Sequence, residues 1–190
     1  DIPTTSNAIA ISEFKNRNPA QEDYTNKLIA SVSVVQDSVE YITISRTGAG
    51  GPAWDGTNFW VTYWYGSVIT AINPVDGSVV KEISCLQNSP REPSGCAYDG
   101  NYLWHTDGNA YNSSTYKCLF KINPDNGAVV ASYTLPTISP RDLTWDGQYL
   151  WYVDVEEYVL VKINSTGGLI TKYNLSIRPG AVEYANGSLF

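Results

Sequence analysis

Apolar residues in this chain fall in short runs that are separated by turns of glycine, proline, asparagine and aspartate. In segment 51–86, the small-residue run "GPAW" leads through Asp-Gly-Thr into the aromatic and β-branched run "NFWVTYW". "VITAIN" and "SVVKEIS" follow, separated by Pro-Val-Asp-Gly. Such runs between Asp-Gly and Asn-Pro turns are typical of antiparallel hairpins. Since no window has helical period, the pattern predicts an all-β protein with four strands in this segment.

The same pattern recurs along the chain. Its first aromatic residue stands at positions 44, 47 and 39 residues apart, namely Trp54, Tyr98, Trp145 and Tyr184. A second aromatic residue keeps step with the first, at Trp60, Trp104, Trp151 and Phe190. A second motif follows each of the first three copies, as "AINPVDGSVV", "KINPDNGAVV" and "KINSTGGLI". Two linked motifs that recur in one order, with a period of 40 to 50 residues, indicate a repeat architecture.

Four antiparallel strands in a period of about 45 residues describe one blade of a β-propeller. The stretch "WDGQYLWYVD…VKIN…GGLITKY" resembles the repeats of YVTN-type and glutamine-cyclotransferase-like propellers, over about residues 28 to 190. This resemblance implies the fold and leaves function open, because propellers host many functions. No catalytic residue of those enzymes can be matched to a position in this sequence. At about 45 residues a blade, the chain is expected to form a four-bladed β-propeller of four-stranded antiparallel blades.

Three full blades are predicted at about 51–86, 95–136 and 142–176. We expect the last blade to be shared between the chain ends, with 181–190 supplying its inner part and 26–45 its later hairpin. Joining the two ends in one blade would hide strand edges that are otherwise prone to pair with other chains. The propeller domain is therefore assigned to residues 26–190, and residues 1–25 form an N-terminal tail.

The tail contains a candidate donor strand. In "SNAIAISEF", two isoleucines alternate with two alanines, as a short strand requires. The second strand of the last blade is expected to stop at Phe190, which aligns with Trp60, so part of that strand is missing. The tail could complete this blade in its own molecule, or it could complete the blade of a neighbour. The donor residues are Ala8, Ile9, Ala10, Ile11 and Phe14, and the acceptor edge comprises Tyr184, Leu189 and Phe190.

Composition narrows the class of protein. A net charge of −7 argues against nucleic acid as a partner, and no apolar run is long enough for a membrane span. The sequence has no methionine and begins with Asp1, so we expect a processed, secreted chain. Four Asn-x-Ser/Thr sequons mark surface turns that could carry glycans: Asn112, Asn164, Asn174 and Asn186.

Three cysteines lack the spacing of a zinc site, and a single histidine, His105, cannot complete one. Cys85 and Cys96 bracket one linker between consecutive blades and are the preferred disulfide pair. Cys118 is then left over, although pairs with Cys118 remain open.

Four of the five arginines lie in the linkers that enter the inner strands: Arg46, Arg91, Arg141 and Arg178. They could form a ring that binds an anion or an acidic sugar, because guanidinium groups suit carboxylate and phosphate. Alternatively, each arginine anchors its own linker to neighbouring carbonyls or aromatic rings. Recurrence in every blade favours anchoring, since a ligand site usually breaks the symmetry of a repeat.

Other polar and aromatic residues are expected to be structural. The aspartates of the Asp-Gly turns, Asp55, Asp99 and Asp146, should accept hydrogen bonds from their own turns. We expect Trp54, Trp60, Trp104, Trp145 and Trp151 to pack between blades. The acidic stretch at Asp154, Glu156 and Glu157 lacks EF-hand spacing and is interpreted as an exposed loop.

The sequence predicts no catalytic residue, no metal site and no cofactor, because no nucleophile elbow or other catalytic motif is present. We therefore expect a secreted structural protein, the subunit of a fibre of tandem-linked propellers that assembles head to tail by strand donation. The alternative is a monomeric secreted propeller that binds a glycan or a protein. An enzyme ranks third.

Overall fold

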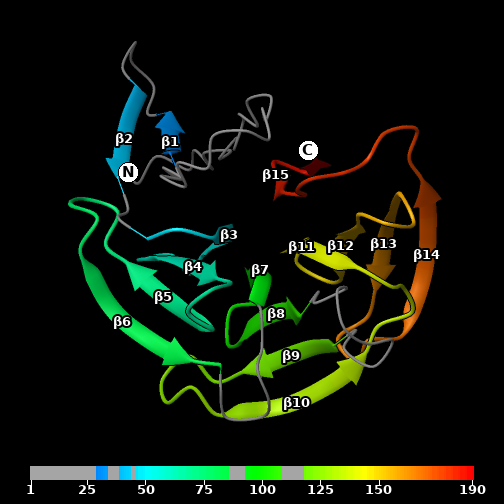
Figure 1. The fold of residues 1–190 in the computed structure, drawn as a ribbon, viewed down its shortest axis with the longest axis horizontal. Helices are drawn as coiled ribbons and strands as arrows, with labels where there is room; N and C mark the ends of the chain where they lie inside the picture. Colours follow the sequence, from blue (N-terminus) through cyan, green and yellow to red (C-terminus); the bar gives the residue numbers. More distant parts are fainter. Residues whose placement is uncertain (1–28, 34–38, 44–45, 86–92, 108–117) are drawn as a thin grey trace.

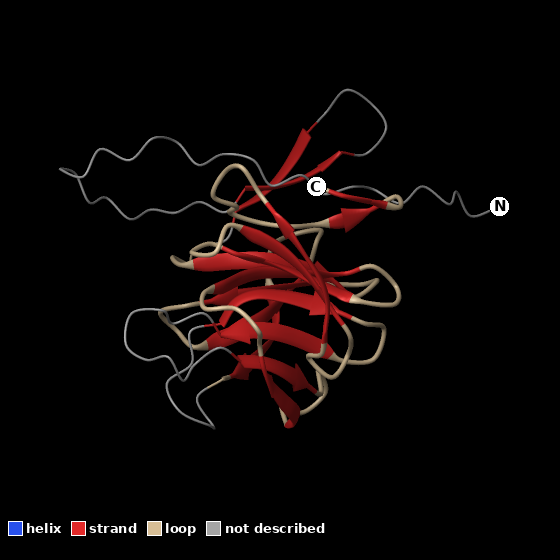
Figure 2. Ribbon diagram, turned by 90° about the vertical axis from the view of Figure 1, so that its right-hand side faces the viewer, coloured by secondary structure: helices blue, strands red, loops and turns tan. Residues whose placement is uncertain are grey.

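The computed structural model describes residues 29–33, 39–43, 46–85, 93–107 and 118–190, and all its regular elements in these ranges are β-strands (Figures 1 and 2). Blade one comprises β3 (Ala49–Trp54), β4 (Phe59–Tyr63), β5 (Val68–Ile72) and β6 (Val79–Ser84). Blade two comprises β7 (Pro93–Tyr98), β8 (Leu103–Asp107), β9 (Cys118–Ile122) and β10 (Val129–Thr134). Blade three comprises β11 (Pro140–Trp145), β12 (Leu150–Asp154), β13 (Val159–Ile163) and β14 (Leu169–Asn174). The three full blades predicted from the repeat are thus confirmed.

Each blade is an antiparallel meander, and the three are arranged around a common centre. The first strands of the blades, β3, β7 and β11, lie innermost, and the last strands, β6, β10 and β14, form the perimeter (Figure 1). Blades one and two join into one eight-stranded sheet, because β3 and β7 form a parallel bridge at Gly51 and Gly95. Blade three is a separate four-stranded sheet.

The chain ends form two further hairpins. β1 (Ile29–Ser33) pairs with β2 (Val39–Thr43), and β15 (Tyr184–Ala185) pairs with β16 (Ser188–Leu189). These hairpins belong to separate two-stranded sheets, so the single shared sheet that the sequence predicts is not confirmed. β16 has only two residues and is therefore too short to pair with the five residues of β1 along their length.

The turn between the first two strands of each blade is built identically. In blade one, Asp55 Oδ1 accepts hydrogen bonds from the amides of Thr57 and Asn58, at 2.7 Å each, while Oδ2 accepts one from Trp60 Nε1 at 2.6 Å. Asp99 and Asp146 make the same three bonds in blades two and three. The expectation that these aspartates cap their own turns is confirmed, and each also fixes the tryptophan of the second strand.

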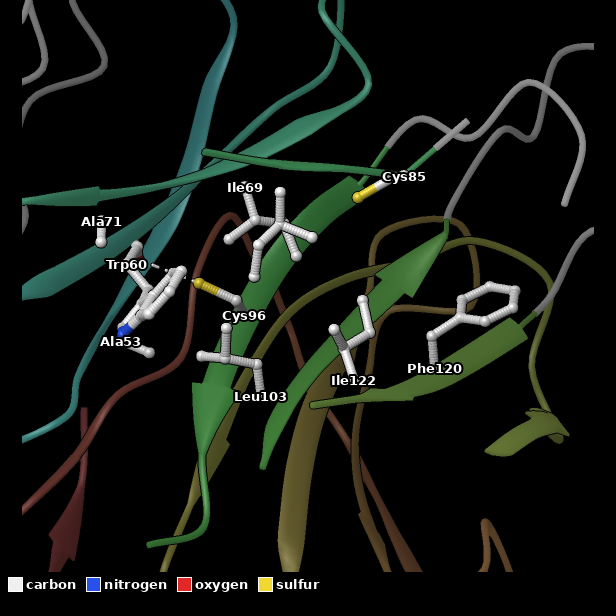
Figure 3. Close-up of a cluster of buried hydrophobic side chains, with 10 residues drawn as sticks. Ala53, Trp60, Ile69, Ala71, Cys85, Cys96, Leu103, Phe120 and Ile122 are labelled. Carbon is white, nitrogen blue, oxygen red and sulfur yellow. Dashed lines mark hydrogen bonds between the residues drawn. The ribbon is translucent and has the colours of Figure 1, made fainter. Parts of the chain in front are cut away.

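Apolar side chains from facing blades form the core. Between blades one and two, Trp60, Ile69 and Ile83 pack with Cys96 and Leu103 (Figure 3). A second cluster joins blades two and three and includes Trp104, Leu119, Leu143, Tyr152 and Val161. Both clusters bury apolar surface, which is the main source of stability in such a fold.

The tryptophans follow the prediction only in part. Trp60 and Trp104 are buried between blades, and Trp145 packs against the second cluster. The expectation is wrong for Trp54, which is 46% exposed and contacts Phe59 of its own blade. Trp151 is half-buried and stacks on Tyr173, also within its own blade. Both residues lie in the blades that border the two terminal hairpins, where no third interface of the same kind is present among the described residues.

Replacing Asp99 by alanine should lower the free energy of unfolding by about 2–3 kcal/mol, because the turn of blade two loses three hydrogen bonds at once. Chemical denaturation of the purified variant measures this change. Asp125→Ala is the matched control, since that carboxylate makes no hydrogen bond within the described part of the chain. Equal stabilities of the two variants would contradict the role assigned to the aspartate.

Candidate functional site

The inner strands approach one another closely at the centre of the molecule. A Cβ atom added at Gly50 would lie 1.8 Å from the carbonyl oxygen of Ser94, so only glycine fits there. Thr62 Oγ1 donates a hydrogen bond to the same carbonyl at 3.2 Å, and Thr106 Oγ1 donates one to the carbonyl of Arg141. Hydroxyl groups thus tie the second strands of blades one and two to the inner strand of the next blade.

Asp142 occupies the space that two glycines leave at this centre. The position three residues before the first aromatic residue is Gly51, Gly95, Asp142 and Ala181 in the four copies of the repeat. A Cβ atom at Gly51 would lie 1.8 Å from Asp142 Oδ1, and one at Gly95 would lie 2.4 Å from it. The carboxylate of blade three therefore packs against the backbones of blades one and two.

Asp142 also holds the C-terminal segment in place. Its Oδ2 accepts a hydrogen bond from the amide of Val182 at 3.1 Å, and Thr144 Oγ1 accepts one from the amide of Tyr184 at the same distance. Asp142 and Thr144 are two residues apart along β11, and their partners Val182 and Tyr184 are two residues apart along the C-terminal segment. Side chains, rather than a backbone ladder, join this segment to blade three in the described structure.

A second carboxyl group lies beside the first. Glu183 stands where the earlier copies of the repeat have Ala53, Ala97 and Thr144. Burial raises the pKa of Glu183 to about 7, although hydrogen bonds from Tyr184 and Thr144 oppose the shift. Burial likewise raises the pKa of Asp142 to about 7, against the lowering effect of the Val182 amide, and the charge of Glu183 adds to the rise.

Sequence reasoning missed this pair of carboxyl groups. A signal was available, because both break the repeat at columns that otherwise hold small residues or threonine. The criterion that a functional site breaks the symmetry, applied above to the arginines, points to these two columns instead.

The side of blade three that the next blade would cover is partly open. In blade one, Ile83 of the outer strand lies against Gly127 in a turn of blade two, where an added Cβ atom would be 2.9 Å from it. In blade two, Tyr133 of the outer strand lies against Gly167 in a turn of blade three, where the corresponding distance is 2.8 Å. The equivalent residue in blade three is Tyr173, which is 50% exposed. Together with exposed Trp54 in blade one, it borders the region of the predicted fourth blade.

The predicted acceptor edge lies in this region. Glu183 and Phe190 exchange backbone hydrogen bonds at 3.1 and 2.8 Å, directly beyond the β15–β16 pair that contains Tyr184 and Leu189. The Phe190 side chain is 71% exposed. The predicted donor residues Ala8, Ile9, Ala10, Ile11 and Phe14 lie outside the described residues.

The described arginines make the contacts of the anchoring alternative. Arg46 pairs with Glu82 at 2.6 Å and lies over the Tyr63 ring. The Arg141 guanidinium lies over the Trp64 ring at 4.1 Å from its centroid. Arg178 Nε donates to the carbonyl of Val155 at 3.0 Å, and its Nη2 binds Glu156 at 2.9 Å. Arg91 lies outside the described residues.

No disulfide joins the three cysteines, so the Cys85–Cys96 bridge expected from the sequence is absent from the structure. The Cys96 sulfur instead lies 3.0 Å from the carbonyl oxygen of Trp60 and 3.3 Å from that of Gly51, and its single S–H group can donate to either oxygen. Burial raises the pKa of Cys96 well above its usual value. Cys85 and Cys96 both belong to the first core cluster (Figure 3), in which Cys118 is partly buried at the edge.

The acidic stretch after β12 is not simply an exposed loop. Asp154 is fully buried, and its carboxylate accepts hydrogen bonds from the amides of Ser139, Glu156 and Glu157. Glu156 and Glu157 form ion pairs with Arg178 and Lys172. In the described ranges, no group of three or more metal-ligating side chains is gathered, and His105 is buried in a stack with Phe120.

Two of the sequons are exposed, at Asn174 and Asn186. Asn164 is partly buried, and its Oδ1 accepts hydrogen bonds from the amides of Thr166 and Gly168. Asn112 lies outside the described residues. The part of the chain that the structure covers contains no helix with the length and apolar character of a membrane span.

Comparisons with known proteins support the fold. No family model and no curated protein matches the sequence. Among solved structures, the glutaminyl cyclase of Myxococcus xanthus is similar with a TM-score of 0.63 and 13% identity, over 83% of this chain and 74% of that one. A streptogramin B lyase is similar with a TM-score of 0.56 and 19% identity, over 87% of this chain and 59% of that one. Hydrazine synthase of Kuenenia stuttgartiensis is similar with a TM-score of 0.52 and 13% identity, over 71% of this chain and 38% of that one.

These structural similarities are evidence for the fold of this chain and not for its function. Glutaminyl cyclase and streptogramin B lyase are β-propellers, so the chain has a propeller-like fold, and the predicted resemblance to glutamine-cyclotransferase-like propellers holds at that level. Both are also enzymes, but at 13–19% identity their activities do not transfer to this chain.

Gly51→Ala should lower the free energy of unfolding by about 1–3 kcal/mol, because the new Cβ overlaps the Asp142 carboxylate. All three near atoms at Gly51 belong to the Asp142 side chain, so the same substitution in an Asp142→Ala background should cost little. Gly95→Ala is the control, since its Cβ also meets the Cα of Asp142 and the amide nitrogen of Leu143. Equal costs of Gly51→Ala in both backgrounds would show that the carboxylate does not fill this space.

Proposed function

We propose that this protein is a structural subunit of an extracellular fibre, in which a β-strand from one molecule completes the fourth blade of the next. The observation that carries the proposal is that each chain end forms a hairpin in a two-stranded sheet of its own. We interpret the two hairpins as the halves of one blade. The proposal assigns the space between the halves to a strand from the N-terminal tail of a neighbouring copy.

The pairing of β1 with β2 supports their assignment to the outer half of the fourth blade. Its register runs from Ile29 opposite Thr43 to Ser33 opposite Val39. The third and fourth strands of blades one and three begin in the same way, with Val68 opposite Ser84 and Val159 opposite Asn174, although those hairpins end in a register shift that β1–β2 lacks. The proposal takes β1 and β2 as the two outer strands of the fourth blade.

The C-terminal hairpin corresponds to the inner half. Tyr184 faces Leu189, as Trp54 faces Phe59 in blade one and Trp145 faces Leu150 in blade three. In the full blades, the second strand continues for four more residues and pairs with the third strand along its whole length. Phe190 already takes the first of these four positions, since it exchanges backbone hydrogen bonds with Glu183, so the proposal fills the positions after it.

A strand at this position should be buried on both faces. Every residue of β4 and β8 is buried, and in β12 only Trp151 is partly exposed. The stretch Ala8–Ile11 is apolar at four consecutive positions and carries no charge. Burying two isoleucine side chains contributes roughly 3–6 kcal/mol, and the strand hydrogen bonds add about 1 kcal/mol each.

Strand addition of this kind satisfies an open edge by main-chain pairing, and pockets for alternate side chains give specificity. Donation from head to tail is a heterologous contact, which produces an open filament when the rotation does not close. Completion of the blade within one molecule would instead give a monomer, and the function would then be that of a secreted binding module.

Deleting residues 1–14 should leave a folded propeller that no longer polymerises, while the intact chain forms filaments visible by negative-stain electron microscopy. Ile9→Asp/Ile11→Asp should also abolish filaments, because each new carboxylate would be buried without the backbone amides that satisfy Asp154 in β12. Thr4→Asp/Thr5→Asp is the matched control and should assemble normally. Filaments from the deletion variant, or an intact chain that sediments as a monomer at high concentration, would contradict strand donation.

A further inference from the structure

We propose that Asp142 and Glu183 form a pH-sensitive latch that docks segment 181–190 on blade three, closed in acid and loosened in mild alkali. This inference goes beyond the proposed function. It concerns a contact within one molecule and does not depend on which chain supplies the missing strand.

The geometry places both carboxyl groups at the seam between blade three and the C-terminal segment, where side-chain hydrogen bonds hold the two together. Asp142 Oδ2 accepts the Val182 amide, and the next residue along the segment is Glu183. Val182 is buried, so the contact is shielded from water and from salt. Undocking the segment would separate Glu183 from Asp142 and expose the side of Asp142 that faces Val182, while Gly51 and Gly95 would still cover its other side.

No cation balances the pair within the described part of the chain. The elements around Asp142 are β3 with Gly51, β7 with Gly95 and Cys96, and the C-terminal segment with Glu183. The Cys96 thiol is neutral in the relevant range, because burial raises its pKa further. The nearest arginine in sequence, Arg141, directs its guanidinium over the Trp64 ring. Thr144, which faces Glu183, carries no charge.

The sign of the effect follows from burial. The pKa of each carboxyl is raised, from 3.8 to about 7 for Asp142 and from 4.5 to about 7 for Glu183. The docked state therefore binds more protons than the open state, and docking is strongest below about pH 4. It weakens as the pH rises through 7, where two buried negative charges come to face each other.

Hydrogen exchange measured by mass spectrometry tests the latch on the intact chain. After correction for the intrinsic exchange rate, the protection of peptides from 181–190 should fall at least tenfold from pH 5 to pH 8. Peptides from 118–134 serve as the internal reference and should change much less. Asp142→Asn/Glu183→Gln should remove most of this pH dependence, whereas Asp125→Asn, an exposed carboxyl in a turn of blade two, should leave it intact.

A wild-type segment with the same protection at both pH values would overturn the proposal, as would a double variant that keeps the full dependence. If the double variant does not fold, carbon-detected NMR titration of the wild-type carboxyl groups decides the question. Asp142 and Glu183 both titrating near pH 4 would refute the latch, and titration of either near pH 7 would support it. Strand donation can fail while these results stand, because neither measurement requires assembly.

Discussion

The close approach of the inner strands at the centre of the ring is the constraint on which the rest of the structure depends. Blades one and two meet through glycine backbones at Gly51 and Gly95, where a single added carbon would collide with a neighbour. Threonine hydroxyls from the second strands bind the carbonyls of the adjacent inner strands. Asp142 fills the remaining space and extends the contact to Val182, so it and Thr144 together hold the C-terminal segment on blade three.

Two kinds of polar residue serve different purposes in this fold. The turn aspartates repeat in all three blades with nearly identical hydrogen bonds, and each fixes a turn and a tryptophan within its own blade. Asp142 and Glu183 each occur once, at columns that hold small residues or threonine in the other repeats. Repetition indicates a scaffolding role here, while departure from the repeat marks the contact between blade three and the C-terminal segment.

Periodicity made the three blades predictable, because each repeat carries its own turn chemistry and its own apolar strands. The capping role of Asp55 followed from the same local rules. What depended on contacts between repeats was harder to infer. The burial of Asp154 and the hydrogen bonds of the Cys96 thiol arise from chain segments that are distant in sequence. Trp54 was expected to be buried because its counterparts are, but no full blade covers it in the described part of the chain.

The central claim is that the fourth blade is completed by a strand lying between the β15–β16 hairpin and the β1–β2 hairpin. Cryo-electron microscopy of the assembled protein, at a resolution that shows side chains, tests it most directly. The account predicts a strand beside Val182 whose density fits Ala8–Ile11 and traces back to a neighbouring subunit. A strand that traces back to the same subunit, or two hairpins with no strand between them, would contradict it.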